Sequence, residues 1–162
     1  MGTGRADRDE AVIEYRAQFA RARELLGRAP THLDTHHWLH DEPALEWAIE
    51  VIARETGTAV RPHDDAQRGR LRAAEVRTVD RYRRDFQHEE HVDLVTLERI
   101  LAGIGEGVTE LGCHPGEADA ELAATSSYAA LRVDELATLI DPRAKAAIDR
   151  NGITLADYTA VA

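Results

Sequence analysis

Apolar residues recur every three or four positions in three stretches of the chain, which is the spacing of helices with one buried face. The stretches run from Asp9 to Gly27, from Asp41 or Glu42 to Gly57, and from Asp93 to Gly105. The glycine at the end of each stretch supplies a helix stop. A fourth helix is expected from Asp141-Pro142, which suits a cap and first turn, to Asn151-Gly152.

Short segments between these helices have the features of strands. Residues 31–40 alternate in character, TAVR (58–61) is closed by a proline, and VTEL (108–111) leads into GCHPG. A last strand is expected over residues 153–161. Helices alternating with strands predict an α/β fold in which parallel strands are joined by covering helices. In such folds the ligand site lies at the carboxyl ends of the strands.

Residues 64–86 combine seven arginines with a weak helical pattern. They indicate either a patch for an anionic ligand or a solvated helix face, and the net charge of −10 favours the second interpretation. The same charge argues against nucleic-acid binding. A single cysteine, and the lack of a signal-peptide core or an apolar run of membrane-spanning length, predict a cytoplasmic protein without a membrane partner. A length of 162 residues suits one domain over residues 9–162, after a disordered tail over residues 1–8.

The segment THLDTHHWLH (31–40) holds four of the eight histidines. In an extended strand Asp34, His36, Trp38 and His40 share one face, and His37 points to the other. Asp34 and His36 can converge on one ion, and His40 can join them if the chain bends. An imidazole near a carboxylate suits zinc, manganese or iron. Alternatively, the carboxylate orients the imidazole, or the histidines bond the backbone of a polar strand end.

The turn after the strand at 108–111 contains a second candidate. His114 there can act as a general acid or base near neutral pH. Cys113 points away from it on a strand and is expected to be a buried small residue. His32 lies at the other end of its strand, so a structural role is expected. The groups His63-Asp64-Asp65 and His88 to His91 are both rich in ligand atoms but fall in predicted loops, where solvated side chains are expected.

Four segments together resemble the YdjC-like family of carbohydrate deacetylases, which includes chitooligosaccharide and hopanoid-pathway members. They are PTHLDTHHWLH (30–40), AVRP (59–62), VTELGCHPG (108–116) and SSYAALRVDELATLIDP (126–142). The resemblance implies a (β/α)-barrel-like hydrolase that removes N-acetyl groups from an amino sugar or oligosaccharide. It also implies a divalent metal ion, magnesium, zinc or similar, that polarises the amide carbonyl and activates a water.

The resemblance carries over to individual residues. His36 corresponds to a metal ligand, and His114 to an active-site histidine that serves as general acid or substrate contact. Asp34, His40 and Arg61 match motif positions, which implies substrate-binding or supporting roles. Trp38 stands where the family usually has a histidine, and it either stacks on a sugar ring or fills space.

Two motifs of the family do not occur in this sequence. One is the strand ending in Asp-Asp-Phe-Gly, which supplies the base and a metal ligand, and the other is built around His-Leu-Asn. A partial barrel that lacks its N-terminal βα units is therefore expected, with an incomplete or inactive site in the isolated chain. The alternative is a noncatalytic remnant that binds a sugar or another chain, either as a homo-oligomer or with a separate N-terminal half.

Overall fold

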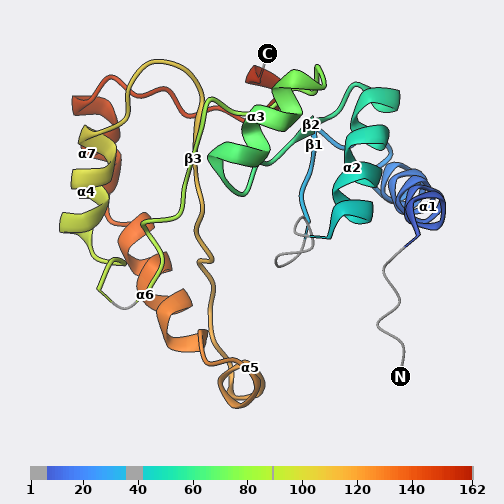
Figure 1. The fold of residues 1–162 in the computed structure, drawn as a ribbon. Coiled ribbons are helices and arrows are strands. Elements are labelled where there is room, and N and C mark those ends of the chain that lie inside the picture. The colour runs from blue at the N-terminus through green and yellow to red at the C-terminus, as the bar shows by residue number, and fades with distance from the viewer. Residues whose placement is uncertain (1–6, 36–41, 89, 162) are drawn as a thin grey trace. The chain divides into compact units, whose positions relative to one another are not determined.

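The computed structural model describes residues 7–35, 42–88 and 90–161, and it has seven α-helices and four short strands within them (Figure 1). Every strand pairs in parallel with one other strand, so the mixed α/β class is confirmed. The chain forms two compact units. The first contains the residues up to Asp80 together with those from Ala156, and the second is Arg81–Leu155. The barrel-like arrangement, the missing N-terminal βα units and the single domain over 9–162 stay predictions.

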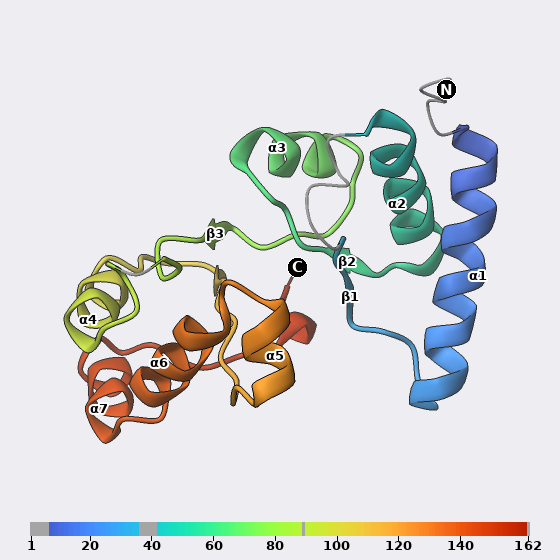
Figure 2. The same cartoon turned by 90° about the horizontal axis from the view of Figure 1, so that it is seen from below.

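The first unit contains three helices and one pair of strands. They are α1 (Arg8–Leu26), β1 (His32–Leu33), α2 (Pro43–Thr56), β2 (Ala59–Val60) and α3 (Asp65–Ala73). The predicted stops are confirmed: Gly27 and Gly57 end α1 and α2 with φ angles of 65° and 67°, a left-handed conformation that glycine adopts without strain. Both views show α1 beside α2 (Figure 1, Figure 2).

The buried centre of the first unit lies between α2, β2 and α3. Its members are apolar side chains from these elements and from the segment after α3, namely Ile49, Ala53, Val60, Leu71 and Val76. That segment returns beside β2, because the Val60 N–H donates to the Arg77 carbonyl at 2.9 Å and the Thr78 hydroxyl donates to the Val60 carbonyl at 2.8 Å. The helical pattern expected over 64–86 therefore ends at Ala73.

The prediction of a last strand over residues 153–161 is wrong. The described part of this segment has a 3₁₀ turn, η2 (Tyr158–Ala160), and no strand. The Asp157 carboxylate accepts hydrogen bonds from the N–H and the hydroxyl of Thr159, at 2.8 and 2.5 Å. A short polar side chain that bonds the backbone two residues on favours a turn over an extended strand.

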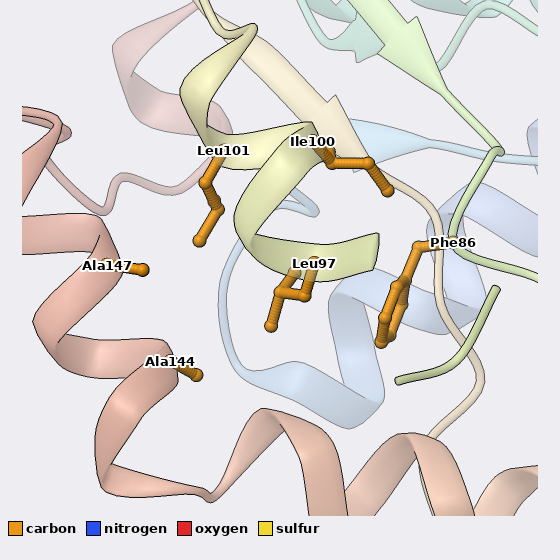
Figure 3. Close-up of a cluster of buried hydrophobic side chains, with 6 residues drawn as sticks. All are labelled: Phe86, Leu97, Ile100, Leu101, Ala144 and Ala147. Carbon is orange, nitrogen blue, oxygen red and sulfur yellow. The ribbon is translucent and has the colours of Figure 1, made fainter. Parts of the chain in front are cut away.

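The second unit contains the remaining strands and helices. They are β3 (Arg81–Arg83), α4 (Leu94–Ala102), β4 (Thr109–Leu111), α5 (Ala120–Thr125), α6 (Ala129–Leu139) and α7 (Pro142–Arg150). The helices predicted after Asp93 and Asp141 are confirmed, and each aspartate caps its helix by accepting a backbone hydrogen bond. The core in Figure 3 joins α4 to α7 around Phe86, which is 0% exposed. Its other members are Leu97, Ile100, Leu101, Ala144 and Ala147.

Two features of this unit differ from what the sequence predicts. β3 falls inside the segment that was expected to be weakly helical, and it pairs with β4 in the register Arg81 with Thr109 and Arg83 with Leu111. In addition, α5, α6 and α7 follow one another with no strand between them.

Candidate functional site

Asp34 and Arg61 lie opposite one another at the carboxyl ends of β1 and β2. The parallel register pairs Leu33 with Val60, and the Arg61 N–H donates to the Leu33 carbonyl at 2.9 Å. Each strand ends there, so the next side chains on both strands leave the sheet at the same edge. Arg61 Nη1 lies 2.5 Å from Asp34 Oδ2, and the side chains are 26% and 34% exposed.

His63 completes this cluster, which corrects its expected place in a solvated loop. Its Nε2 lies 3.0 Å from the Thr35 hydroxyl oxygen and 3.5 Å from Asp34 Oδ1, and its side chain is only 12% exposed. The His63 N–H donates to Gln67 Oε1 at 2.8 Å, and Gln67 is itself buried at 1% exposure. The ring of His63 is therefore held at the strand ends, while its backbone N–H is held by α3.

The other two members of the His63-Asp64-Asp65 group have structural or solvated roles. Asp64 caps α3 by accepting a hydrogen bond from the Gln67 N–H at 2.6 Å, while the Asp65 side chain is 86% exposed. The sequence did contain a signal for His63. It follows Arg61 by two positions across a buried proline, and this spacing returns a side chain to the same side of an extended segment.

A cavity of about 470 Å³ adjoins this strand end. Asp34 and Thr35 form part of its lining, and α1 and α2 contribute most of its apolar wall. The apolar side chains are Tyr15, Phe19, Ala22, Leu26, Leu33, Ile49 and Ile52. Burial raises the pKa of the Tyr15 phenol. The cavity therefore joins a charged strand end to an apolar surface large enough for a small ligand.

Three of the predicted site residues, His36, Trp38 and His40, lie outside the described residues. His32 stacks on the Tyr158 ring at 4.0 Å between ring centroids and 10° between planes, in agreement with a structural role. Within the described part of the chain, no three histidine, cysteine or acidic side chains are grouped to hold a metal. The Asp34 carboxylate is paired with the Arg61 guanidinium.

His114 follows β4 in the second unit, as predicted, and its side chain is exposed. The Gly112 N–H donates to the Arg83 carbonyl at 2.8 Å and continues the pairing of β3 with β4. The His114 N–H donates to the buried Glu135 carboxylate of α6. Its imidazole ring meets the Tyr128 ring edge-on, at 5.6 Å between centroids and 71° between planes.

Cys113 and the group from His88 to His91 are the remaining side chains of metal-ligand type that the sequence pointed to. Cys113 is half-buried and packs against the core around Phe86, close to the small buried residue that was expected. His88 and Glu90 are exposed, in agreement with a solvated loop, whereas His91 is half-buried. The structure thus brings Asp34, Thr35, Arg61 and His63 together in one unit and holds His114 in the other.

Comparison with known proteins identifies the family. The YdjC-like protein family matches residues 1–150. A carbohydrate deacetylase of Geobacillus stearothermophilus is 37% identical over 136 residues, which cover 82% of this chain and 52% of that protein. A chitooligosaccharide deacetylase of Serratia marcescens is 32% identical over 158 residues, which cover 96% of this chain and 62% of that protein. This chain therefore spans about half to three-fifths of the length of these curated relatives.

A solved structure shows the same fold. It is a protein of Enterococcus faecalis V583 that was proposed to be a cellobiose-phosphate cleavage protein. The TM-score is 0.81 at 28% identity, and the match covers 95% of this chain and 61% of that one. With the sequence motifs, the parallel strand ends and these matches in agreement, the chain belongs to the YdjC-like family.

Proposed function

We propose that this chain forms part of a metal-dependent hydrolase that removes N-acetyl groups from an amino sugar or oligosaccharide. The main observation behind the proposal is the cluster of Asp34, Arg61 and His63 at the carboxyl ends of two parallel strands. Asp34 lies two residues before His36 in the sequence. Family membership and the deacetylases among the relatives support the reaction class. We also propose that the short parallel strands are part of a (β/α)-barrel-like domain in the complete fold.

In this proposal His36 is a metal ligand through a neutral imidazole nitrogen. When bound, a divalent ion such as magnesium or zinc would polarise the amide carbonyl and lower the pKa of a bound water. Asp34, held by Arg61 and His63, would orient the adjacent metal-binding segment. His40 and Trp38 would contact the sugar. His114 would donate a proton to the departing amine or hold the sugar in place.

The 162 residues by themselves are expected to bind metal weakly and to release little or no acetate. The relatives that share the motifs are longer, and this chain matches only 52–62% of their length. A hydrolytic metal site usually needs three protein ligands and an open position, whereas the proposal assigns one ligand to this chain.

Titration calorimetry with zinc and magnesium tests the ligand assignment in the 162-residue chain. His36→Ala should weaken zinc binding at least tenfold, because a direct ligand is removed. His37→Ala is the matched control, since its side chain is predicted to face away from the site. Equal zinc affinity in the wild type and the His36→Ala variant would show that the assignment is wrong.

A second candidate is a noncatalytic role in self-association, favoured by the apolar surface of α1. Ile13, Leu25 and Leu26 are 65%, 68% and 54% exposed. Exposed apolar side chains of this kind can be buried against a second copy of the chain. Size-exclusion chromatography with light scattering would detect a dimer, and Leu25→Glu should dissociate it. A stable monomer at high concentration would rule this candidate out.

A further inference from the structure

Helix α6 binds both main-chain polar groups of His114. The His114 N–H donates to Glu135 Oε2, and Arg132 Nη1 donates to the His114 carbonyl at 3.2 Å. Two residues further along, the Gly116 N–H donates to the Arg132 carbonyl at 3.1 Å. The turn that carries His114 is thus hydrogen-bonded to one helix at His114 and at Gly116, although the His114 side chain is exposed.

Glu135 is the central group of this attachment. It is 0% exposed, and both of its carboxylate oxygens accept hydrogen bonds: Oε2 from the His114 N–H and Oε1 from the Tyr128 hydroxyl. A buried carboxylate is costly unless donors surround it, and an apolar side chain would pack a helix at lower cost. Helix packing alone therefore does not account for a glutamate at this position.

Tyr128 contributes twice. Its hydroxyl donates a hydrogen bond to Glu135, and its ring packs edge-on against the His114 ring at 5.6 Å between ring centroids. Burial, together with the hydrogen bond to Glu135, raises the pKa of Tyr128 to about 12, so the phenol stays protonated and able to donate well above neutral pH.

The rest of the turn is equally restricted. A Cβ at Gly112 would lie 2.7 Å from the Tyr82 hydroxyl oxygen, so a larger residue there would have to displace that side chain or the turn. Pro115 limits the backbone of His114 to extended conformations. With the backbone fixed in this way, the remaining freedom of His114 is largely the rotation of its side chain, and the Tyr128 ring limits that rotation.

We infer that Glu135 and Tyr128 are positioning residues, which hold the backbone and the ring of His114 in the orientation that meets the substrate. The inference rests on the proposed function for the catalytic relevance of His114. The attachment itself is independent of that function, because it is built from contacts within the second unit.

Nuclear magnetic resonance of the complete 162-residue chain tests the inference without metal or substrate. Tyr128→Phe keeps the ring and removes only the hydroxyl, and Glu135→Gln keeps the shape and removes the charge. Glu135→Gln should shift the His114 amide proton upfield and speed its exchange with solvent about tenfold, since a charge-assisted hydrogen bond is weakened. Tyr128→Phe leaves Glu135 Oε1 without its donor, so the carboxylate can reorient, and the shift and exchange rate of the His114 amide proton should change. Both should also change the ring signals of His114.

Thr138→Val is the matched control on the same helix. Its hydroxyl donates to the Val92 carbonyl at 2.5 Å and does not touch His114, so general loosening of α6 is measured separately. His114 signals that stay unchanged in Tyr128→Phe, or that change equally in Thr138→Val, would overturn the inference. If Glu135→Gln does not fold, Tyr128→Phe decides alone. If the His114 signals change as expected but no metal binding depends on His36, the proposed function fails and the positioning role remains.

Discussion

Arg61 Nη1 lies 2.5 Å from Asp34 Oδ2, and this ion pair joins the carboxyl ends of the two parallel strands of the first unit. Both side chains are only about a third exposed or less, so solvent screens the pair less than a surface pair. The pair holds the carboxylate two residues before His36, the proposed metal ligand. The arrangement at this strand end therefore depends on contacts that are distant in sequence.

Removal of this ion pair should destabilise the first unit. Arg61→Ala is expected to lower the free energy of unfolding by about 1 kcal/mol, because Asp34 keeps its partial burial and loses its cation. Both tryptophans, Trp38 and Trp47, fall within residues 1–80, so their fluorescence during urea denaturation reports on this unit. Arg68→Ala is the control, since its partner Asp65 is 86% exposed and little change is expected.

His63 should affect metal binding without being a ligand. His63→Ala removes the contacts to Thr35 and Asp34, and loss of such an orienting partner is expected to lower zinc affinity at least tenfold. Titration calorimetry measures the effect, with Asp65→Ala as a control for a neighbouring exposed side chain. Equal affinity in His63→Ala and wild type would mean that the cluster does not orient the metal-binding segment.

The close approach at Gly112 gives a prediction for the second unit. Gly112→Ala places a Cβ 2.7 Å from the Tyr82 hydroxyl oxygen and 2.9 Å from Gln87 Nε2, so the turn or these side chains must move. We expect a loss of roughly 1–3 kcal/mol in stability, measured by urea denaturation followed by circular dichroism. Gly69→Ala is expected to have the opposite effect on stability. Gly69 lies within α3, and no neighbouring atom lies within 4 Å of an added Cβ, so the substitution should stabilise the chain by up to about 1 kcal/mol.

Tyr128 predicts a loss of stability at alkaline pH. Its pKa is raised from 10.0 to about 12 in the folded chain, so between these values the folded chain keeps a proton that the unfolded chain has lost. The folded state then binds more protons, and its stability must fall as the pH rises through this window. Below pH 10 Tyr128 is protonated in both states, so its contribution to the free energy of unfolding is fully present. Urea denaturation of wild type and Tyr128→Phe across this range should show a steeper decline in wild type; parallel declines would contradict the assignment.

The helix ends of this fold are largely predictable from sequence. Asp93 and Asp141 cap their helices as expected, and Gly27 and Gly57 end theirs, because each of these signals acts through hydrogen bonds or backbone angles within a few residues. Two of the expected strands are likewise found at residues 32–33 and 59–60, and Asp34 and Arg61 form an ion pair directly after them.

Contacts between distant segments were not predictable in the same way. His63 looked like a loop residue because only the parallel pairing of β1 with β2 brings it to Thr35, 28 positions earlier. β3 consists of a tyrosine between two arginines, so it lacks the pattern of apolar residues at every second position that identifies a strand. Its pairing with β4 decides its conformation. Nothing in the sequence distinguishes Glu135 from a solvated charge on a helix, because one of its two hydrogen-bond donors, the His114 N–H, lies 21 positions earlier.

The most direct test of the central claim is acetate release by a chimera with the Serratia marcescens relative. This chain would replace the part that it matches, 62% of that chitooligosaccharide deacetylase, and the rest of the relative would be kept. With a divalent metal and N-acetylated chitooligosaccharide, the account predicts turnover by the chimera, and its loss in His36→Ala and His114→Ala but not in Asp65→Ala. A folded chimera that releases no acetate, or one whose turnover survives His36→Ala, would contradict the account.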